Sequence, residues 1–216
     1  MKNRRTIICV ALTTVLAVTT LAGAQELKTI QLPEPQKTGG MPLMEALMNR
    51  QSSREYSTRK LPPQELSNLL WAANGFNRPD RNLRTAPTAS NRQEQSVYVI
   101  LEEGAYVYDA AANTLDPVVT GDIRKSAGKQ DFVFIAPVNL AYVADLTKMG
   151  GNNRDAKIVT ASTDTGFISQ NVYLYCASSG LATVVRGMFD RDTLHNALKL
   201  GPDQYITWTQ TVGYPE

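Results

Sequence analysis

The stretch TGFISQNVYLYCASS, residues 165–179, decides the fold. Its apolar side chains, which run from Phe167 and Ile168 to Cys176 and Ala177, cover nearly every face of a helix, and Gly180 ends that helix. A helix that is apolar all round is buried all round. We therefore predict that this helix lies in the core of the protein or in an interface between subunits.

Shorter elements follow this helix on its C-terminal side. Residues 181–185 and 205–212 have the composition of strands, and residues 190–198 that of a helix with Asp190 as its N-cap. The N-terminal side contains more helices and strands, separated by polar loops. Helices are predicted at residues 42–49, from Pro62 to Gly75 and at 121–136. A hairpin is predicted at 96–101 and 105–108, a strand at 139–144 and a long loop at 76–91. This interleaving does not form regular βαβ units and predicts an α+β fold, a mixed sheet packed by helices.

The first residues have the pattern of an export signal. Lys2, Arg4 and Arg5 precede an apolar stretch at residues 6–21, and Ala22-Gly23-Ala24 supplies the small residues of a cleavage site. We predict a signal peptide at residues 1–24 and an extended arm at 25–40, followed by one domain at 41–216. The protein is then exported, to the periplasm or beyond, without stable membrane association after cleavage; the alternative is an N-terminal membrane anchor.

The net charge and the cysteine content exclude some classes of partner and of stabilising bond. The chain has 22 Lys and Arg against 20 Asp and Glu, and cleavage removes three of the cations, leaving 19 against 20 and a net charge of −1. A near-neutral chain without a basic run argues against a nucleic-acid partner. Cys9 leaves with the signal, so Cys176 has no intramolecular partner and stability must come from a core.

Side-chain catalysts are scarce in this sequence. His195, the one histidine, is predicted to lie on the surface of a helix, and Cys176 is predicted to be a buried thiol with a raised pKa. No cluster has metal-ligand spacing, and no G-x-S-x-G, Walker or G-x-G-x-x-G motif is present. A chain of this kind binds a ligand or uses the chemistry of a cofactor.

Three segments point to a cofactor. The run Arg50-Gln51-Ser52-Ser53-Arg54 offers guanidinium groups and hydroxyls to a phosphate. Residues 84–93 combine small side chains, which allow close approach to a planar ring, with an Asn amide. Residues 180–190 follow the apolar helix and contain Gly187, which would expose backbone N–H groups near a ligand. Each segment taken alone is also typical of an ordinary loop or turn.

In this order and at these separations, the three segments resemble the nitroreductase superfamily. The Arg50–Arg54 run is similar to an R-x-S-x-[RK] motif, residues 87–93 to P-S-x-x-N-x-Q with Thr88 in place of Ser, and residues 170–190 to the central helix and the loop that faces the flavin. The hairpin GAYVYD at residues 104–109 resembles the SagB-type dehydrogenase-like branch. The resemblance covers residues 41–215 and implies a mainly antiparallel sheet and a homodimer with FMN at the interface.

The resemblance also implies roles for individual residues. Arg50, Ser52 and Arg54 would bind the FMN phosphate and ribityl chain, with Gln51 near the pyrimidine edge. Pro87, Thr88 and Asn91 would contact the flavin from the partner subunit, and backbone groups of Val185, Arg186 and Gly187 would face its reactive N5 and O4 region. No side chain is assigned as catalytic: hydride would pass through flavin N5 to or from a small-molecule substrate.

One departure from the family pattern leaves alternatives open. The chain ends Gly213-Tyr214-Pro215-Glu216 and lacks the basic residue that many family members carry after the last strand, so Arg186 or Arg84 would have to replace it. Two other hypotheses remain: a non-catalytic flavin- or ligand-binding envelope protein on the same scaffold, and an unrelated secreted interaction domain.

Overall fold

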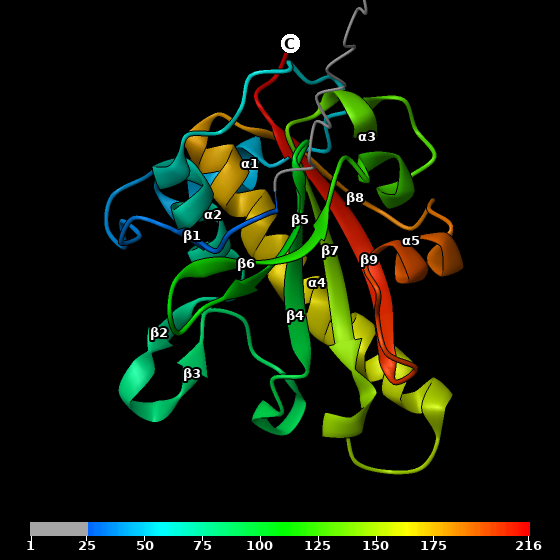
Figure 1. Cartoon of the computed structure of the whole chain (residues 1–216). Helices are drawn as coiled ribbons and strands as arrows, with labels where there is room; N and C mark the ends of the chain where they lie inside the picture. The colour runs from blue at the N-terminus through cyan, green and yellow to red at the C-terminus, as the bar shows by residue number, and fades with distance from the viewer. Residues whose placement is uncertain (1–25) are drawn as a thin grey trace, which may run out of the picture.

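The computed structural model describes residues 26–216, and an antiparallel sheet of seven strands runs through them (Figure 1). The strand order is β1-β6-β5-β4-β7-β9-β8, and each neighbouring pair is antiparallel. The strands are β1 (Ile30–Gln31), β4 (Gln95–Ile100), β5 (Gly104–Asp109), β6 (Thr114–Thr120), β7 (Val138–Asp145), β8 (Ala182–Arg186) and β9 (Gln204–Gly213). The predicted fold class, a mainly antiparallel α+β sheet packed by helices, is confirmed.

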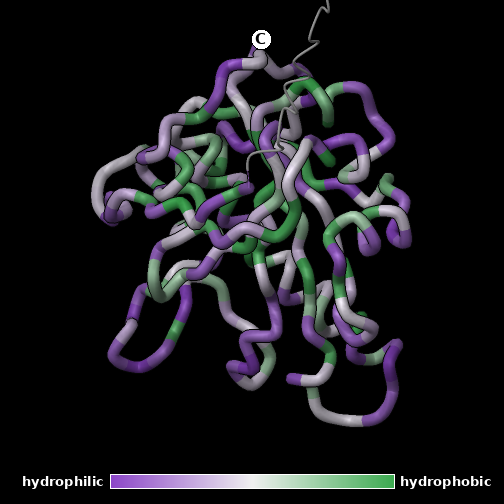
Figure 2. The backbone as a smooth tube through the Cα atoms, in the orientation of Figure 1, coloured by the Kyte–Doolittle hydropathy of each residue, from purple (hydrophilic) through white to green (hydrophobic). Residues whose placement is uncertain are grey.

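Helices cover both faces of this sheet. One face carries α1 (Leu43–Asn49), α2 (Pro63–Asn74) and α4 (Arg154–Ser179), while α3 (Phe132–Ile135) and α5 (Arg191–Ala197) lie on the other (Figure 1). In β4, Val97 and Val99 face α2 and α4, whereas Tyr98 and Ile100 face α5. Because side chains alternate along a strand, a strand that is apolar at every position is buried on both faces. Apolar residues accordingly gather in the central strands, and the peripheral loops are hydrophilic (Figure 2).

The central helix α4 is longer than predicted and is not buried on every face. It begins at Arg154, where the side chain of Asn153 accepts the N–H of Ala156 at 3.0 Å, and ends at Gly180, whose φ of 69° favours glycine. Ile168, Val172 and Cys176 are fully buried against the sheet. Phe167 remains 44% exposed, so within a single chain the expected burial all round is not met.

Several predicted elements are confirmed. Helix α2 begins beside Pro62 and ends at Gly75, and β4 and β5 form the predicted hairpin. Helix α5 has the predicted cap, with the carboxylate of Asp190 accepting the N–H of Thr193 at 2.8 Å. These elements depend on contacts between residues that are close in sequence.

The helix predicted at residues 121–136 is wrong. The chain there forms a 3-10 turn, η3 (Arg124–Ala127), and the short α3, separated by Gly128 in an extended conformation. The guanidinium of Arg186 donates a hydrogen bond to the carbonyl of Ala127 at 2.7 Å, at the point where the helical pattern breaks. A Cβ on residue 128 would also clash with that guanidinium. Arg186, which follows Gly128 by 58 positions, therefore packs at the place where the predicted helix is interrupted.

Two further expectations need correction. The loop at residues 76–91 contains a small antiparallel pair, β2 (Phe76–Arg78) and β3 (Leu83–Arg84), with 3-10 turns η1 (Pro79–Arg81) and η2 (Ala89–Asn91). In addition, no strand is predicted at residues 114–120, where the structure has β6. Pro117 lies in β6 where the register with β5 shifts, a bulge that accommodates a residue with no N–H.

The described part of the N-terminal arm lies extended against the domain. Strand β1 pairs with β6, Leu32 is buried, and the N–H of Gln36 donates to Asn68 on α2 at 2.8 Å. The predicted signal peptide, residues 1–24, lies outside the described residues. Among the helices of residues 26–216, none has the length and apolar character to cross a membrane.

Candidate functional site

The segment of residues 50–54, here called the arginine segment, follows α1 and runs along the free edge of β8. The N–H of Ser53 donates to the carbonyl of Thr183 at 3.0 Å, and the buried Tyr56 donates its hydroxyl to the carbonyl of Ser53 at 2.7 Å. Strand β8 is the last strand of the sheet, so its outer edge has backbone groups available for this pairing. The arginine segment is thereby held against residues 183–185.

Tyr173 on α4 joins the arginine segment to β8. Its hydroxyl oxygen accepts the N–H of Val185 at 3.0 Å and lies 2.8 Å from Oγ of Ser52. Because Val185 occupies an acceptor position, the tyrosine hydrogen is available for Ser52, and Ser52 can then donate its own hydrogen to a ligand. The guanidinium of Arg50 lies over the ring of Tyr173, 5.3 Å from its centre. Sequence reasoning missed Tyr173, although a tyrosine within an apolar helix signals a hydroxyl that needs a partner.

A cavity of about 370 Å³ opens beside Tyr173. Gln51 and Ser53 line it on one side, and Leu181 and Thr183 on the other. In the part of the chain that the structure describes, neither Arg50 nor Arg54 forms an ion pair. Arg50, Ser52 and Arg54 are not among the residues that line this cavity. Their guanidinium and hydroxyl groups, next to it in the arginine segment, are a donor set that fits a phosphate.

Gly187, at the end of β8, is required by a close contact. A Cβ on this residue would lie 2.7 Å from Cζ3 of Trp208. The β7–β9 register shifts here, because Ala141 pairs with Thr209 but Val143 pairs with Ile206, which leaves two residues of β9 opposite Tyr142. Bulges of this kind redirect side chains and are common beside active sites. Trp208 is 39% exposed and lies next to the residues that the sequence assigns to the flavin ring.

Arg186 and Arg84, the two candidates for a further cation at the phosphate, both form hydrogen bonds within the fold. The Arg186 guanidinium is buried and donates to the carbonyl of Ala127 at 2.7 Å and to Oδ1 of Asn139 at 3.1 Å. Burial lowers the pKa of Arg186 to about 10, against an opposing effect of Tyr56. Arg84 donates to Gln93 at 2.8 Å and to the carbonyl of Asn74 at 2.7 Å. That either one contacts the phosphate stays a prediction.

Residues 87–91, here called the threonine loop, lie beside the middle of α4, at Asp164. The N–H of Ala89 donates to the buried carboxylate of Asp164 at 2.9 Å, and Oγ1 of Thr88 accepts the N–H of Gln93 at 2.9 Å. Asn91 has a φ of 51°, a left-handed conformation that Asn tolerates. Asp164 precedes Tyr173 by nine residues, about 13 Å along a helix axis. The structure therefore does not bring Pro87, Thr88 and Asn91 to the arginine segment of the same chain.

His195 lies outside the site, and Cys176 lines the cavity beside Tyr173 as a buried thiol. His195 lies on α5 with Nε2 3.0 Å from the carbonyl of Gly201, and Cys176 is a fully buried free thiol whose pKa is raised by burial. Among residues 26–216, no group of three or more His, Cys, Asp or Glu side chains is placed to hold a metal ion. The described chain thus offers the arginine segment, Tyr173 and β8, a set suited to binding and positioning.

Comparisons with known proteins agree with this arrangement. The model of the Nitroreductase family matches residues 47–214. A proposed nitroreductase of Methanocaldococcus jannaschii is 32% identical over 181 residues, which cover 79% of this chain and 89% of that protein.

Two solved structures have the same fold. A proposed nitroreductase of Ralstonia eutropha JMP134 is 39% identical with a TM-score of 0.83, and the match covers 88% of this chain and 90% of that protein. A nitroreductase family protein of Clostridium difficile 630 is 26% identical with a TM-score of 0.60, and the match covers 82% of this chain and 86% of that protein.

Proposed function

Because the chain belongs to the nitroreductase family, a family of oxidoreductases, we propose that it is an exported, FMN-dependent enzyme that acts as a homodimer on a small-molecule substrate. The observation that carries the proposal is the hydroxyl of Tyr173, which links Ser52 of the arginine segment to the backbone of Val185. This link holds the residues assigned to the phosphate and those assigned to the flavin ring in a fixed relation.

We propose roles for these residues from the family resemblance. Arg50, Ser52 and Arg54 hold the phosphate and ribityl chain, and Gln51 lies near the pyrimidine edge. Residues 185–187 carry the backbone groups that face the ring. Bound FMN supplies hydride transfer through its N5 position. The protein supplies position and electrostatics, which suits a site built from hydrogen-bonding and cationic groups.

Two features support a second copy of this chain as the partner. Helix α1 packs against α4 and exposes Leu43, Met44, Leu47 and Met48, which are 62, 76, 44 and 78% exposed. A contiguous exposed apolar surface of this kind is typical of an interface. The threonine loop is also too far along α4 to reach the arginine segment of its own chain. In the proposed dimer, Pro87, Thr88 and Asn91 complete the site of the partner.

The remaining parts of the proposal rest on the sequence. The signal at residues 1–24 supports export, to the periplasm or beyond. The GAYVYD hairpin supports the SagB-type dehydrogenase-like branch. NAD(P)H is scarce outside the cytoplasm, so we propose a different electron donor or acceptor. The substrate is proposed only as a small organic molecule.

The absorbance spectrum of the purified mature protein, taken before and after addition of FMN and desalting, tests the proposal. Retained flavin bands are expected. A colourless protein that does not retain FMN would contradict it. That result would favour the alternative, a non-catalytic ligand-binding envelope protein, which is supported by the internal bonds of Arg186 and Arg84.

A further inference from the structure

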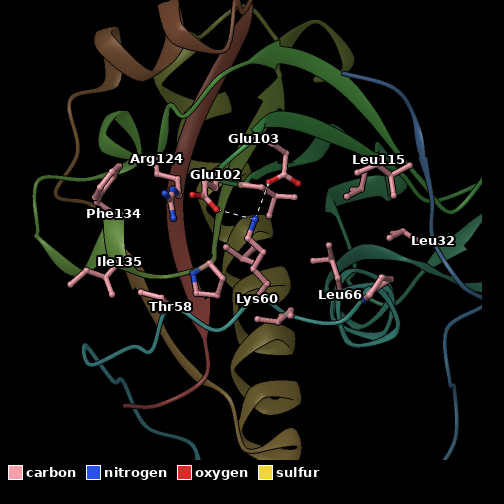
Figure 3. A pocket seen from close by; sticks show the side chains of 16 residues that line it. Leu32, Thr58, Lys60, Leu66, Glu102, Glu103, Leu115, Arg124, Phe134 and Ile135 are labelled. Atoms are coloured by element: carbon pink, nitrogen blue, oxygen red, sulfur yellow. Dashed lines mark ion pairs between the residues drawn. The ribbon is translucent and has the colours of Figure 1, made fainter. Parts of the chain in front are cut away.

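A second cavity, of about 420 Å³, lies at the end of the sheet where the β4–β5 turn meets the start of α2 (Figure 3). It shares no lining residue with the cavity beside Tyr173. Its volume is within the range of small-molecule pockets, about 300–1,000 Å³. The family resemblance assigns no role to its residues. We call it the hairpin cavity.

One end of the hairpin cavity is formed by the core. Leu32, Leu66 and Leu115 line this end, and each is less than 10% exposed (Figure 3). They come from the N-terminal arm, α2 and β6 and belong to the main apolar cluster of the protein. Because these side chains are held by core packing, this end is a preformed apolar wall.

The opposite end has apolar side chains that the described chain leaves open. Phe134 and Ile135 on α3 line the cavity and are 42% and 44% exposed. Arg124 and Lys125 lie over the ring of Phe134, 4.8 and 4.7 Å from its centre, and hold that ring in place. An exposed aromatic residue next to an exposed isoleucine, lining the same cavity as a buried apolar wall, is a surface that an apolar ligand would cover.

The charged groups around the cavity pair with one another. Nζ of Lys60 lies 2.9 Å from Glu102 and 4.0 Å from Glu103, and the ion pairs cross the middle of the cavity (Figure 3). Nη2 of Arg124 lies 2.6 Å from Asp122. A charged ligand would leave water for an apolar wall without gaining an unpaired counter-charge, which is unfavourable. The hydroxyl of Thr58, which lines the cavity and has no side-chain hydrogen bond among the described residues, is an uncharged polar group that a ligand can use.

We propose that the hairpin cavity is a second binding site, which takes a neutral, largely apolar small molecule with one hydroxyl or carbonyl group. The apolar body lies between the leucine wall and Phe134, and the polar group bonds to Thr58. This site does not depend on flavin, because the two cavities have separate walls.

Fluorescence of N-phenyl-1-naphthylamine, a neutral apolar probe, tests the site in the mature protein with FMN in excess. The probe is expected to bind, and decanol is expected to displace it at a concentration about tenfold or more below that needed for decanoate or decylamine. Failure of the probe to bind, or equal displacement by the three ligands, would overturn the proposal. The flavin spectrum recorded on the same samples reports on the proposed enzyme separately.

Two variants locate the ligand. Ile135→Glu places a charge in the exposed part of the wall and is expected to weaken probe binding about tenfold or more. Ala111→Glu, an equally exposed substitution on the β5–β6 turn, is the matched control and should leave binding unchanged. Thr58→Val is expected to weaken decanol several-fold but not the probe. Unchanged probe binding in Ile135→Glu, or unchanged decanol binding in Thr58→Val, would contradict the assigned contacts.

Discussion

Ser52 and Tyr173 are joined hydroxyl to hydroxyl at 2.8 Å, across 121 positions of sequence. The same tyrosine oxygen accepts the N–H of Val185. This phenol therefore joins the arginine segment to the edge strand, beside the direct bond from the N–H of Ser53 to the carbonyl of Thr183. The predictions below begin from this contact.

Tyr173→Phe is expected to weaken FMN binding about tenfold and to lower the free energy of unfolding by about 1–3 kcal/mol, because it leaves the N–H of Val185 without its partner. FMN titration and chemical denaturation measure the two effects. Tyr175→Phe is the control on the same helix: its hydroxyl donates to Glu65 at 2.6 Å, away from β8, so it should lose stability but keep its FMN affinity. Equal FMN affinities in both variants would refute a role for Tyr173 in the site.

Arg50→Ala combined with Arg54→Ala is expected to reduce FMN affinity about a hundredfold or more, since each charge-assisted bond to a phosphate contributes about 1.5–3 kcal/mol. Added FMN should then no longer raise the melting temperature. Arg78→Ala with Arg81→Ala, which removes two exposed cations from the β2–β3 turn, provides the control for net charge. If both double variants retain flavin equally, the arginine segment does not hold the phosphate.

Gly187→Ala is expected to cost about 1–3 kcal/mol of stability, because the new Cβ overlaps the Trp208 ring at 2.7 Å. Trp208→Leu in the same chain should relieve most of that cost. A double-mutant cycle measured by urea unfolding gives the coupling between the two positions. Additive effects would show that the close contact does not determine the glycine.

Glu94→Gln is expected to abolish the fall in stability that the wild-type protein shows as pH rises towards neutral. Burial, followed by the contact with Asp164, raises the pKa of Glu94, whose Oε2 has no hydrogen-bond partner among the described residues. The folded state then binds more protons than the unfolded state above pH 4.5, so wild-type stability falls as pH rises from there towards the raised pKa. The glutamine resembles the protonated acid and should lack this slope.

Urea midpoints of wild type and Glu94→Gln between about pH 4 and pH 8 measure this difference. Carboxyls such as Asp122, whose pKa is lowered by its hydrogen bond to Arg124, contribute to both proteins and cancel. Glu55→Gln, at an exposed position, should follow the wild type. Parallel pH profiles for wild type and Glu94→Gln would rule out a raised pKa of Glu94 in the folded state.

Cys176 is expected to react with a thiol reagent about a thousandfold more slowly in the folded mature protein than in guanidinium chloride. Its side chain is fully buried, and burial raises its pKa, so little thiolate forms. The reaction rate with dithionitrobenzoate measures this. Rapid reaction in the folded state would show that this part of α4 opens readily.

Local patterns in the sequence determined several of the elements. The cap at Asp190, the stop at Gly180 and the β4–β5 hairpin each depend on neighbours within a few residues, and the structure has all three. The family resemblance also came from sequence order alone, and the family match confirms it.

Tertiary structure alone decided which segments meet and where local preference fails. The buried guanidinium of Arg186 donates a hydrogen bond to the carbonyl of Ala127 where the helix predicted at 121–136 breaks. Tyr173 joins Ser52 to Val185 across distant positions of the sequence. The threonine loop, in contrast, is bonded to Asp164 near the middle of α4, nine residues before Tyr173. Such contacts depend on where the sheet and helices pack in space, and spacing along a single sequence does not encode that distance.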